Sequence, residues 1–436
     1  MSTPPILDKL FELKERETSV HTEVIAGVTT FFTLSYIVFV NPAILSSAGM
    51  DFHSVYVATC VAAAFGCLLM GLWANYPIAL APGMGLNAYF ATVLVLDKGI
   101  PWQVALGAVF CSGVLFMILS YLPVREWILN SIPKSQKLAI ASGIGLFLVF
   151  LALQSAGIIQ DNPVNLVQVG DLTRWSVLLV LVGFVVILAL ENRKIPGGIL
   201  GVILVISIIS WVGGISDPPT GVVAIQSLHT EAFLSLDILG ALEIGLLVVI
   251  FSFLLVDLFD TNGTLVALLG RFGMMSGEGK IPKLRRALLA DSSATVVGSL
   301  MGTSTTTSYI ESASGMQAGG KTGLTAVIVG LLMLLMLLFE PLAGAIPAFA
   351  VAPAILFVGC IMVQSLQSID WDDLTEIVPA VVTAISIPLT FSIATGIGTG
   401  FICYVMAKLF SGKISDIHPA MAIIAGLFML KFVFDL

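Results

Sequence analysis

Long apolar stretches separated by short polar ones dominate this chain from Val24 to its C-terminus. They cover residues 24–44, 53–73, 78–95, 101–121, 137–158, 175–192 and 195–215, and then 238–269, 287–302, 305–319, 322–341, 345–364, 374–391 and 393–410. At about 18–22 residues, most can cross the roughly 30 Å hydrocarbon core of a bilayer as helices. A last run, 417–434, is either a further span or a helix lying against the membrane. The pattern predicts an all-α polytopic membrane protein with about 14 spans.

Two of these runs are irregular. The third, YPIALAPGMGLNAYFATVLVL, opens with Pro77 and Pro82 and has two glycines near its middle. The tenth, GTSTTTSYIESASGMQAGG, is short and rich in Ser, Thr and Gly. Irregular backbone at membrane depth must be buried in protein or line a cavity. Both runs are third in a set of seven, which predicts an inverted-repeat transporter with its site between two broken helices.

This reading divides the chain into four parts. Residues 1–22 form a cytoplasmic N-terminal segment, 23–215 the first inverted repeat, 216–236 an extracytoplasmic loop, and 237–436 the second repeat with the extra apolar run.

The distribution of basic residues supports this assignment of membrane spans and loops. With the N-terminus in the cytoplasm and alternating spans, 16 of the 19 Lys and Arg residues fall in segments on the cytoplasmic side. The outside segments hold only Lys98 and Arg174, and the side of Lys431 depends on the last run. We therefore expect a multi-pass protein of the inner or plasma membrane with a cytoplasmic N-terminus.

The amino-acid composition excludes several classes of protein. The chain is 58% hydrophobic and only 11% charged, with a mean hydropathy of +1.05, whereas a soluble domain carries about 25% charged residues. A net charge of -8 also argues against a nucleic-acid partner. The five cysteines lie inside apolar runs without a C-x-x-C pair, so we expect no disulfide scaffold, no metal site and no cofactor. A soluble enzyme and a disordered chain are excluded.

Ionisable residues inside apolar runs are functional candidates, because placing them at mid-membrane costs about 2.5–3.5 kcal/mol on insertion scales. Asp257 and Asp260 share one helix face at spacing i, i+3 in the eighth run. Glu311 lies in the broken tenth run, and no intramembrane Lys or Arg is available to neutralise it. Asn87 occupies the corresponding place in the third run and offers both a donor and an acceptor.

Structural roles compete with these functional ones. Asp260 could cap a turn at residues 261–263, Asp257 could pair with a hydroxyl, and Asn87 could be a structural hydrogen-bonder. Asp291, near the cytoplasmic end of the ninth run, is expected to interact with the nearby Arg285 and Arg286 instead of the site.

One motif points to a different chemistry. Residues 315–322, GMQAGGKT, fit the phosphate-binding pattern G-x-x-x-x-G-K-[ST]. A working P-loop needs a preceding strand and a soluble α/β core, whereas this segment lies between two intramembrane runs. We therefore expect no nucleotide hydrolysis here.

All four histidines fall in loops or at span ends, so carboxylates are the only strong proton carriers inside the membrane. The spans hold no cation at depth to bind an anion. The residues alone indicate a carboxylate-lined carrier for a small neutral or cationic solute, coupled to protons or sodium.

Several motifs resemble a known family. APGMGLNAYF (81–90), VDLFDTNGTL (256–265), TSYIESASG (307–315) and AGGKTGLTA (318–326) resemble the AzgA-like purine permeases, a branch of the nucleobase–ascorbate transporter family, with adenine permeases looking closest. EVIAGVTTFFTLSYIVFVNP (23–42) and SGIGLF (142–147) match as well, so the resemblance covers nearly the whole chain.

The resemblance implies the uracil-permease-like fold, with fourteen spans in two inverted repeats of seven, often as a homodimer. Spans 1–4 and 8–11 would form a core domain and spans 5–7 and 12–14 a gate domain. It also implies import of adenine, guanine or hypoxanthine by proton symport, without enzymatic activity.

By position in the family's motifs, Asp260 matches the carboxylate that faces the base, and Glu311 matches its partner. Asp257 and Asn87 match positions implicated in substrate contact or coupling. The roles of Asp257 and Asp260 are interchangeable at this stage, since either is a candidate proton site.

Two neighbours of Glu311 complete the expected site. Tyr309 and Ile310 would offer backbone groups or an apolar wall to the ring.

Three other functions stay open. An anion carrier of the related sulfate-transporter fold would usually carry a soluble C-terminal domain, whereas this chain ends in an apolar run. An intramembrane aspartyl protease places its two aspartates on separate helices, whereas Asp257 and Asp260 are three residues apart. A pore is the third alternative.

Overall fold

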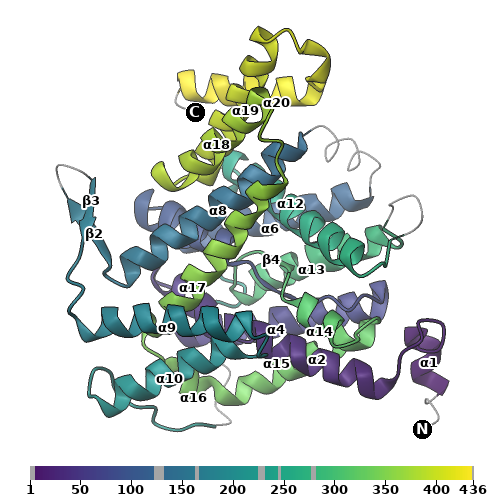
Figure 1. Cartoon of the computed structure of the whole chain (residues 1–436), viewed down its shortest axis with the longest axis vertical. Helices are drawn as coiled ribbons and strands as arrows, with labels where there is room; N and C mark the ends of the chain where they lie inside the picture. The colour runs from purple at the N-terminus through teal and green to yellow at the C-terminus, as the bar shows by residue number, and fades with distance from the viewer. Residues whose placement is uncertain are drawn as a thin grey trace.

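The computed structural model describes residues 5–121, 132–162, 166–223, 231–243, 247–275 and 281–434. Arg125 and Lys280, which the charge map placed in the cytoplasm, lie outside these ranges, as does part of the predicted loop 216–236. The described chain is mostly helical (Figure 1).

The elements of the first half follow the predicted runs. They are α1 (Pro5–Phe11), α2 (Val20–Leu34), α3 (Ile37–Ser46), α4 (Phe52–Leu69), η1 (Met70–Ala74), β1 (Leu80–Pro82), α5 (Met84–Ala88), η2 (Tyr89–Asp97), α6 (Trp102–Tyr121), α8 (Lys134–Ser155), β2 (Ile159–Asn162), β3 (Leu166–Val169), α9 (Trp175–Asn192) and α10 (Gly198–Val212).

The second half is also mostly helical. Its elements are α11 (Ile238–Ala241), α12 (Leu247–Arg271), α13 (Leu284–Met301), β4 (Thr306–Ser308), α14 (Ser312–Gln317), α15 (Gly323–Met336), η4 (Leu337–Phe339), α16 (Glu340–Gly344), α17 (Ala348–Val363), η5 (Gln364–Ser368), α18 (Leu374–Leu389), α19 (Ile393–Phe410), η6 (Ile414–Asp416) and α20 (Pro419–Phe434).

The helices confirm a polytopic membrane protein. Within the described ranges, nine helices or helix pairs are long and apolar enough to cross a membrane, and four shorter apolar helices accompany them. A span count of fourteen stays a prediction.

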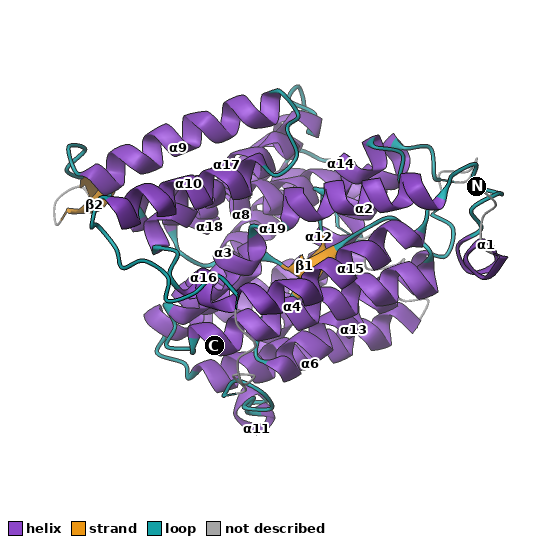
Figure 2. Ribbon diagram, turned by 90° about the horizontal axis from the view of Figure 1, so that it is seen from below, coloured by secondary structure: helices purple, strands orange, loops and turns teal. Residues whose placement is uncertain are grey.

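The third and tenth runs are broken, as predicted. Asn75 adopts a left-handed conformation with φ 56° and ends η1, and Pro77 and Pro82 cannot donate backbone hydrogen bonds. The chain therefore continues as the short strand β1, which pairs antiparallel with β4 in the register Leu80↔Ser308, Ala81↔Thr307 and Pro82↔Thr306. Figure 2 shows this strand pair among the surrounding helices, near the middle of the molecule.

Helices of the two halves pack against one another. One set of contacts joins α4 to α13 and α15, α6 to α13, and α2 to α14 and α15. Another joins α8 to α17 and α18, α18 to α19, and α9 to α10 and α17. The β2–β3 hairpin and α1 lie at opposite edges of the molecule (Figure 1).

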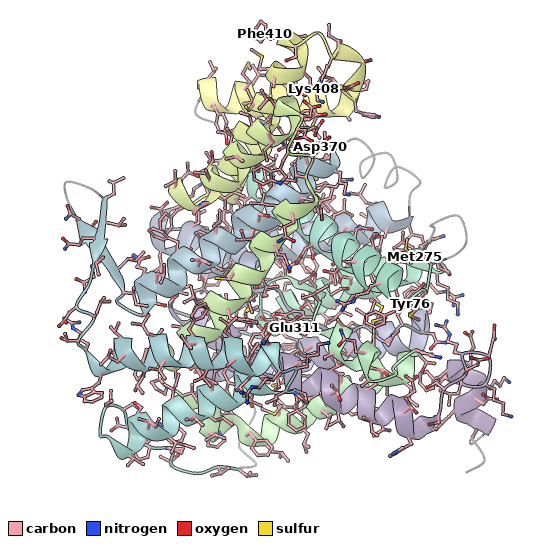
Figure 3. The ribbon with its side chains drawn as sticks, in the orientation of Figure 1. Tyr76, Met275, Glu311, Asp370, Lys408 and Phe410 are labelled. Atoms are coloured by element: carbon pink, nitrogen blue, oxygen red, sulfur yellow. The ribbon has the colours of Figure 1, made fainter. Side chains whose placement is uncertain are left out.

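An ion cluster ties the last helices together. Lys408, on α19, is almost completely buried, and its ammonium lies 2.7 Å from Glu376, 3.7 Å from Asp373 and 3.5 Å from Asp416. The hydrogen bond from Lys413 at 2.8 Å holds the pKa of Asp373, which precedes α18, well below its usual value. Lys408 lies far from Glu311 at the centre of the molecule (Figure 3).

Candidate substrate site

The two broken segments hold each other through backbone hydrogen bonds. Besides the β1–β4 ladder, the Gly83 amide donates to the Thr305 carbonyl at 2.8 Å, and the Tyr309 amide donates to the Ala79 carbonyl at 3.0 Å. These contacts give hydrogen-bond partners to backbone groups, which the hydrocarbon of a bilayer cannot do. Residues 79–83 and 305–309 are thereby placed side by side, although more than 200 positions separate them in the sequence.

Asp260 lies on α12 beside β4. The Thr307 hydroxyl donates to its Oδ2 at 3.3 Å, and the Thr261 hydroxyl lies 3.0 Å from that of Thr307. The carboxylate is only half-buried. Because α12 continues without a break through residues 261–263, the alternative that Asp260 caps a turn is wrong.

Asp257, one turn earlier on α12, is fully buried. The Thr295 hydroxyl donates to its Oδ2 at 3.2 Å, which is the contact that the structural alternative for this residue described. Its other oxygen, Oδ1, has no partner within the described part of the chain.

Asp291 is the residue that the sequence analysis placed wrongly. It is fully buried on α13, and the Ser308 hydroxyl of β4 donates to its Oδ1 at 3.1 Å. Arg285 instead lies 4.1 Å from the centre of the Tyr121 ring, and Arg286 donates to the Trp73 carbonyl. The apolar residues around Asp291 were the signal that could have identified it.

These aspartates form one electrostatic group around β4. Asp257 interacts through charge with both Asp291 and Asp260, and Asp260 also interacts with Glu311. Among the described residues, no group of three or more His, Cys, Asp and Glu side chains is arranged to hold a metal ion.

Glu311 directly precedes α14 and is half-buried near the centre of the molecule (Figure 3). The Tyr36 hydroxyl, from the break between α2 and α3, donates to its Oε1 at 2.7 Å. Sequence reasoning missed Tyr36, since no local pattern connects it to residue 311.

Asn87 belongs to a chain of hydrogen bonds with a fixed direction. The Thr59 hydroxyl donates to the Val55 carbonyl at 2.6 Å, so its oxygen can only accept from the Asn41 amide group at 2.7 Å. The Asn41 oxygen therefore faces Asn87 and accepts from its amide nitrogen. The Asn87 Oδ1 is left as a buried acceptor without a partner in the described structure.

Tyr309 is buried, whereas its neighbour Ile310 is exposed. Tyr309 is 5% exposed, and its hydroxyl donates to the Pro82 carbonyl at 2.5 Å while its amide donates to Ala79. Both of its donors are therefore occupied, which leaves its ring and the acceptor capacity of its hydroxyl oxygen to contact a solute. Ile310 is 45% exposed and presents an apolar side chain beside Glu311.

Buried polar atoms without partners gather around the strand pair. Within the described ranges they include atoms of Asn87, Asp257, Asp291, Ser304, Thr305 and Thr306. Native proteins satisfy most such atoms, so their concentration here makes the surroundings of the strand pair a candidate site for a polar solute or ordered water.

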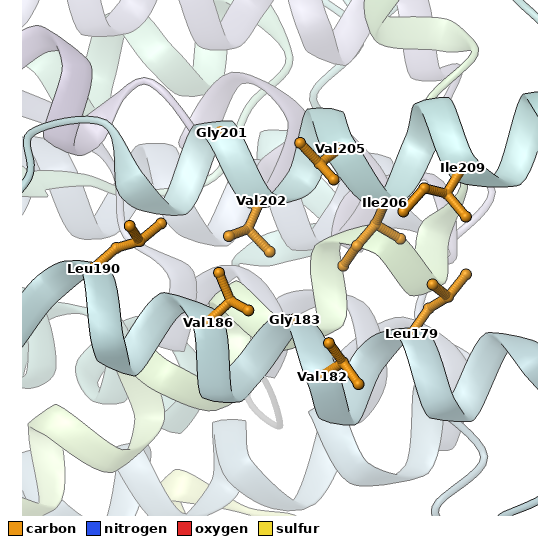
Figure 4. A pocket seen from close by; sticks show the side chains of 10 residues that line it. All are labelled: Leu179, Val182, Gly183, Val186, Leu190, Gly201, Val202, Val205, Ile206 and Ile209. Carbon is orange, nitrogen blue, oxygen red and sulfur yellow. The ribbon is translucent and has the colours of Figure 1, made fainter.

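A groove between α9 and α10 has the opposite character. Its volume is about 320 Å³, and it is lined by Leu179, Val182, Gly183, Val186, Leu190, Gly201, Val202, Val205, Ile206 and Ile209 (Figure 4). Such a purely aliphatic lining offers a polar solute no hydrogen bond and suits contact with hydrocarbon.

Comparisons with known proteins agree with this picture. A sequence profile of the Permease family matches residues 21–399. The chain is 47% identical to the adenine permease AdeP of Escherichia coli, over 98% of this chain and 96% of that protein. It is 42% identical to the guanine/hypoxanthine permease PbuO of Bacillus subtilis, over 97% of this chain and 99% of that protein.

Among solved structures, the transmembrane domain of the cyanobacterial bicarbonate transporter BicA is similar in fold. The TM-score is 0.65 at 17% identity, covering 87% of this chain and 97% of the other.

The family match spans most of the chain, and these relatives are permeases, which excludes the intramembrane protease. The motifs that resembled AzgA-like permeases include the segments that meet at β1 and β4. The chain therefore belongs to the Permease family, on its purine nucleobase permease branch.

Proposed function

We propose that this protein imports purine nucleobases, with adenine as the preferred substrate, by proton symport. The observation that carries the proposal is the group of carboxylates around two paired broken segments, in a chain similar over nearly its full length to adenine and guanine/hypoxanthine permeases.

The four carboxylates differ in exposure, and we assign them different roles on that basis. Asp260 and Glu311 are half-buried and can contact a solute, whereas Asp257 and Asp291 lie behind them without exposure. A purine is flat and neutral and carries N–H donors beside acceptor nitrogens. We assign the base to Asp260 and Glu311, with Ile310 and the Tyr309 ring as apolar walls and the Asn87 oxygen as a further acceptor.

Proton coupling follows from the cost of burying charge. Several carboxyl groups lie at membrane depth and form no ion pair with a cation among the described residues. Binding a proton avoids the free-energy cost of an unpaired charge there. A protonated carboxyl group can also donate to a ring nitrogen, which a carboxylate cannot. Base and proton then bind to one network and favour each other's binding, with Asp257, Asp260 and Glu311 as the coupling residues.

We further propose fourteen spans in two inverted repeats, with spans 1–4 and 8–11 as the core and spans 5–7 and 12–14 as the gate. The strand pair between corresponding runs of the two halves supports the repeat. The two sets of helix contacts described above support the core and gate. The charge map supports a cytoplasmic N-terminus, and the family resemblance supports a homodimer.

The test is uptake of labelled adenine by cells that lack their own purine permeases, with and without a protonophore. Unlabelled adenine, hypoxanthine, guanine and uracil serve as competitors. Protonophore-sensitive uptake blocked by adenine alone is the expected result. Competition by guanine and hypoxanthine would broaden the substrate range, and uptake that follows a sodium gradient instead would overturn proton coupling.

An anion carrier is the second candidate, because the chain shares its fold with a bicarbonate transporter. A cation also lies on this side of α12: the Lys137 ammonium is 5.8 Å from the centre of the ring of Phe259, the residue before Asp260 in the sequence. Four carboxyl groups nevertheless lie around the strand pair, and each of them would repel an anion whenever it is ionised. Uptake of labelled bicarbonate or sulfate, with no uptake of purines, would establish this alternative.

A further inference from the structure

A second buried carboxylate lies away from the candidate substrate site, at the start of α2. Glu23 is fully buried and accepts four hydrogen bonds. The Thr18 hydroxyl and the Lys321 amide donate to Oε1 at 2.9 and 3.0 Å. The Thr322 amide and the Thr325 hydroxyl donate to Oε2 at 3.2 and 2.6 Å. Four neutral donors therefore stabilise the charge, and no Lys or Arg of the described chain forms an ion pair with it.

The donors belong to the segment that resembles a phosphate-binding loop. Lys321 and Thr322 are the last two residues of the GMQAGGKT motif, and Thr322 is also the N-cap of α15. Amides at a helix N-terminus have no partner within the helix and favour a negative group. In this chain the negative group is the protein's own Glu23, which explains how the motif occurs without a nucleotide site.

Glycines allow the loop to close around the carboxylate. Gly319 has φ +105°, a conformation that side chains rarely adopt. A Cβ on Gly320 would lie 2.7 Å from the Thr325 hydroxyl and 2.8 Å from the Ala26 Cβ.

Besides Glu23, α2 and the residues that follow it contact the start of α14. The Thr33 hydroxyl lies 2.8 Å from that of Ser314, and Tyr36 donates to Glu311. The α2–α3 segment therefore contacts α14 near its start and just beyond its end (Figure 1). A helix of six residues is not stable alone and depends on such contacts.

We propose that Glu23 is a positioning residue of the transporter. Its carboxylate fixes the loop between α14 and α15 to α2, and thereby keeps Glu311 in the geometry that binds the solute. The role of Glu311 in this inference rests on the proposed function.

The first test measures stability, which does not depend on any substrate. Glu23→Ala removes the carboxylate that accepts from four donors, two of them in buried contacts, and acetate is small enough to replace it. We expect Glu23→Ala to lower the Tm of the purified protein in detergent, and sodium acetate to raise it again relative to equal sodium chloride. Wild type and Glu15→Ala, a matched change of an exposed glutamate in the same segment, should show no such response.

The second test measures exchange of labelled for unlabelled adenine in proteoliposomes, which needs no proton gradient for acetate to disturb. We expect Glu23→Ala to raise the KM for adenine by about tenfold, and acetate to restore it. Purely structural damage would lower Vmax and leave the KM of the surviving protein unchanged.

Two further variants test the same proposal if Glu23→Ala does not fold. Thr325→Val removes one donor, whereas Thr325→Ser keeps it, so only the former should raise KM. The proposal is overturned if acetate leaves the Tm of Glu23→Ala unchanged, or if these variants lower Vmax alone. Failure of the wild type to exchange adenine would contradict the proposed function instead, while the Tm test of Glu23 would stand.

Discussion

At the scale of single residues, the site combines carboxylates of different accessibility. Asp260 and Glu311 are half-buried, whereas Asp257 and Asp291 are closed off from solvent. Groups that receive a solute must be reachable, and groups that only store a proton need not be. Under the proposed function, exposure therefore favours Asp260 over Asp257 as the residue that would contact the base, a choice that motif resemblance left open.

Glu311→Gln is the first prediction at this scale. Glutamine keeps the side chain's shape and an acceptor for Tyr36 but cannot exchange a proton at working pH. We expect accumulation of labelled adenine to fall to the level reached with a protonophore, while adenine exchange across the membrane persists. Accumulation by the mutant to wild-type levels would refute the coupling role.

The directed chain of hydrogen bonds from Thr59 through Asn41 to Asn87 leads to a second prediction. The Asn41 amide nitrogen donates to the hydroxyls of Thr59 and Thr303, and only Thr59 has its own proton committed to a carbonyl. Thr59→Val removes that acceptor, so the orientation of Asn41, and with it that of Asn87, is no longer fixed. A misdirected hydrogen bond costs about 1–2 kcal/mol, so the KM for adenine should rise by about tenfold.

Thr59→Ser is the matched control for this chain, because it retains the hydroxyl. Competition by purine analogues should change in Thr59→Val and stay unchanged in Thr59→Ser. Equal KM values and equal competition in both variants would show that the orientation of Asn87 does not matter.

At the scale of elements, close packing of α14 against α2 depends on glycine. A Cβ on Gly315 would lie 2.0 Å from the Thr30 hydroxyl and 2.5 Å from the Ala26 carbonyl. Contacts this short force the backbones apart, and α14 carries Glu311 at its start.

Gly315→Ala should therefore lower both stability and transport. Overpacking of this kind costs about 1–3 kcal/mol, which should be visible as a lower Tm in detergent and as slower adenine uptake. Gly201→Ala on α10 is the control, since no atom lies within 4 Å of its added Cβ. A Tm for Gly315→Ala equal to that of Gly201→Ala would contradict the packing argument.

At the scale of the whole molecule, the orientation in the membrane follows from the distribution of charge. The described hairpin β2–β3 and the helix α1 lie at opposite edges of the molecule (Figure 1). The charge map assigns the hairpin to the outside and α1 to the cytoplasm.

Cysteine labelling tests this orientation. In a variant without native cysteines, a membrane-impermeant maleimide should label Gln168→Cys on intact cells, because residue 168 is exposed in the hairpin. Glu15→Cys, exposed near the N-terminus, should react only after the cells are permeabilised. The reverse pattern would invert the topology.

Much of this architecture follows from the sequence alone. Hydrocarbon solvates apolar side chains and rejects unpaired backbone groups, so the composition of each segment determines whether it crosses the membrane as a helix. For the same reason, prolines, glycines and hydroxyl residues marked the two broken runs. The cost of a carboxylate at depth identified Asp257, Asp260 and Glu311 without any knowledge of their neighbours.

Only the tertiary structure decided which of these residues meet. The pairing of Leu80–Pro82 with Thr306–Ser308, the contact of Tyr36 with Glu311 and that of Ser308 with Asp291 join positions far apart in the chain. No local pattern encodes such contacts, because they depend on how whole helices pack. Asp291 and Glu23 show the consequence, since in the sequence both are acidic residues near the end of an apolar run. Both are fully buried, and only their tertiary partners distinguish them: Asp291 accepts from Ser308 of β4, whereas Glu23 accepts from the loop before α15.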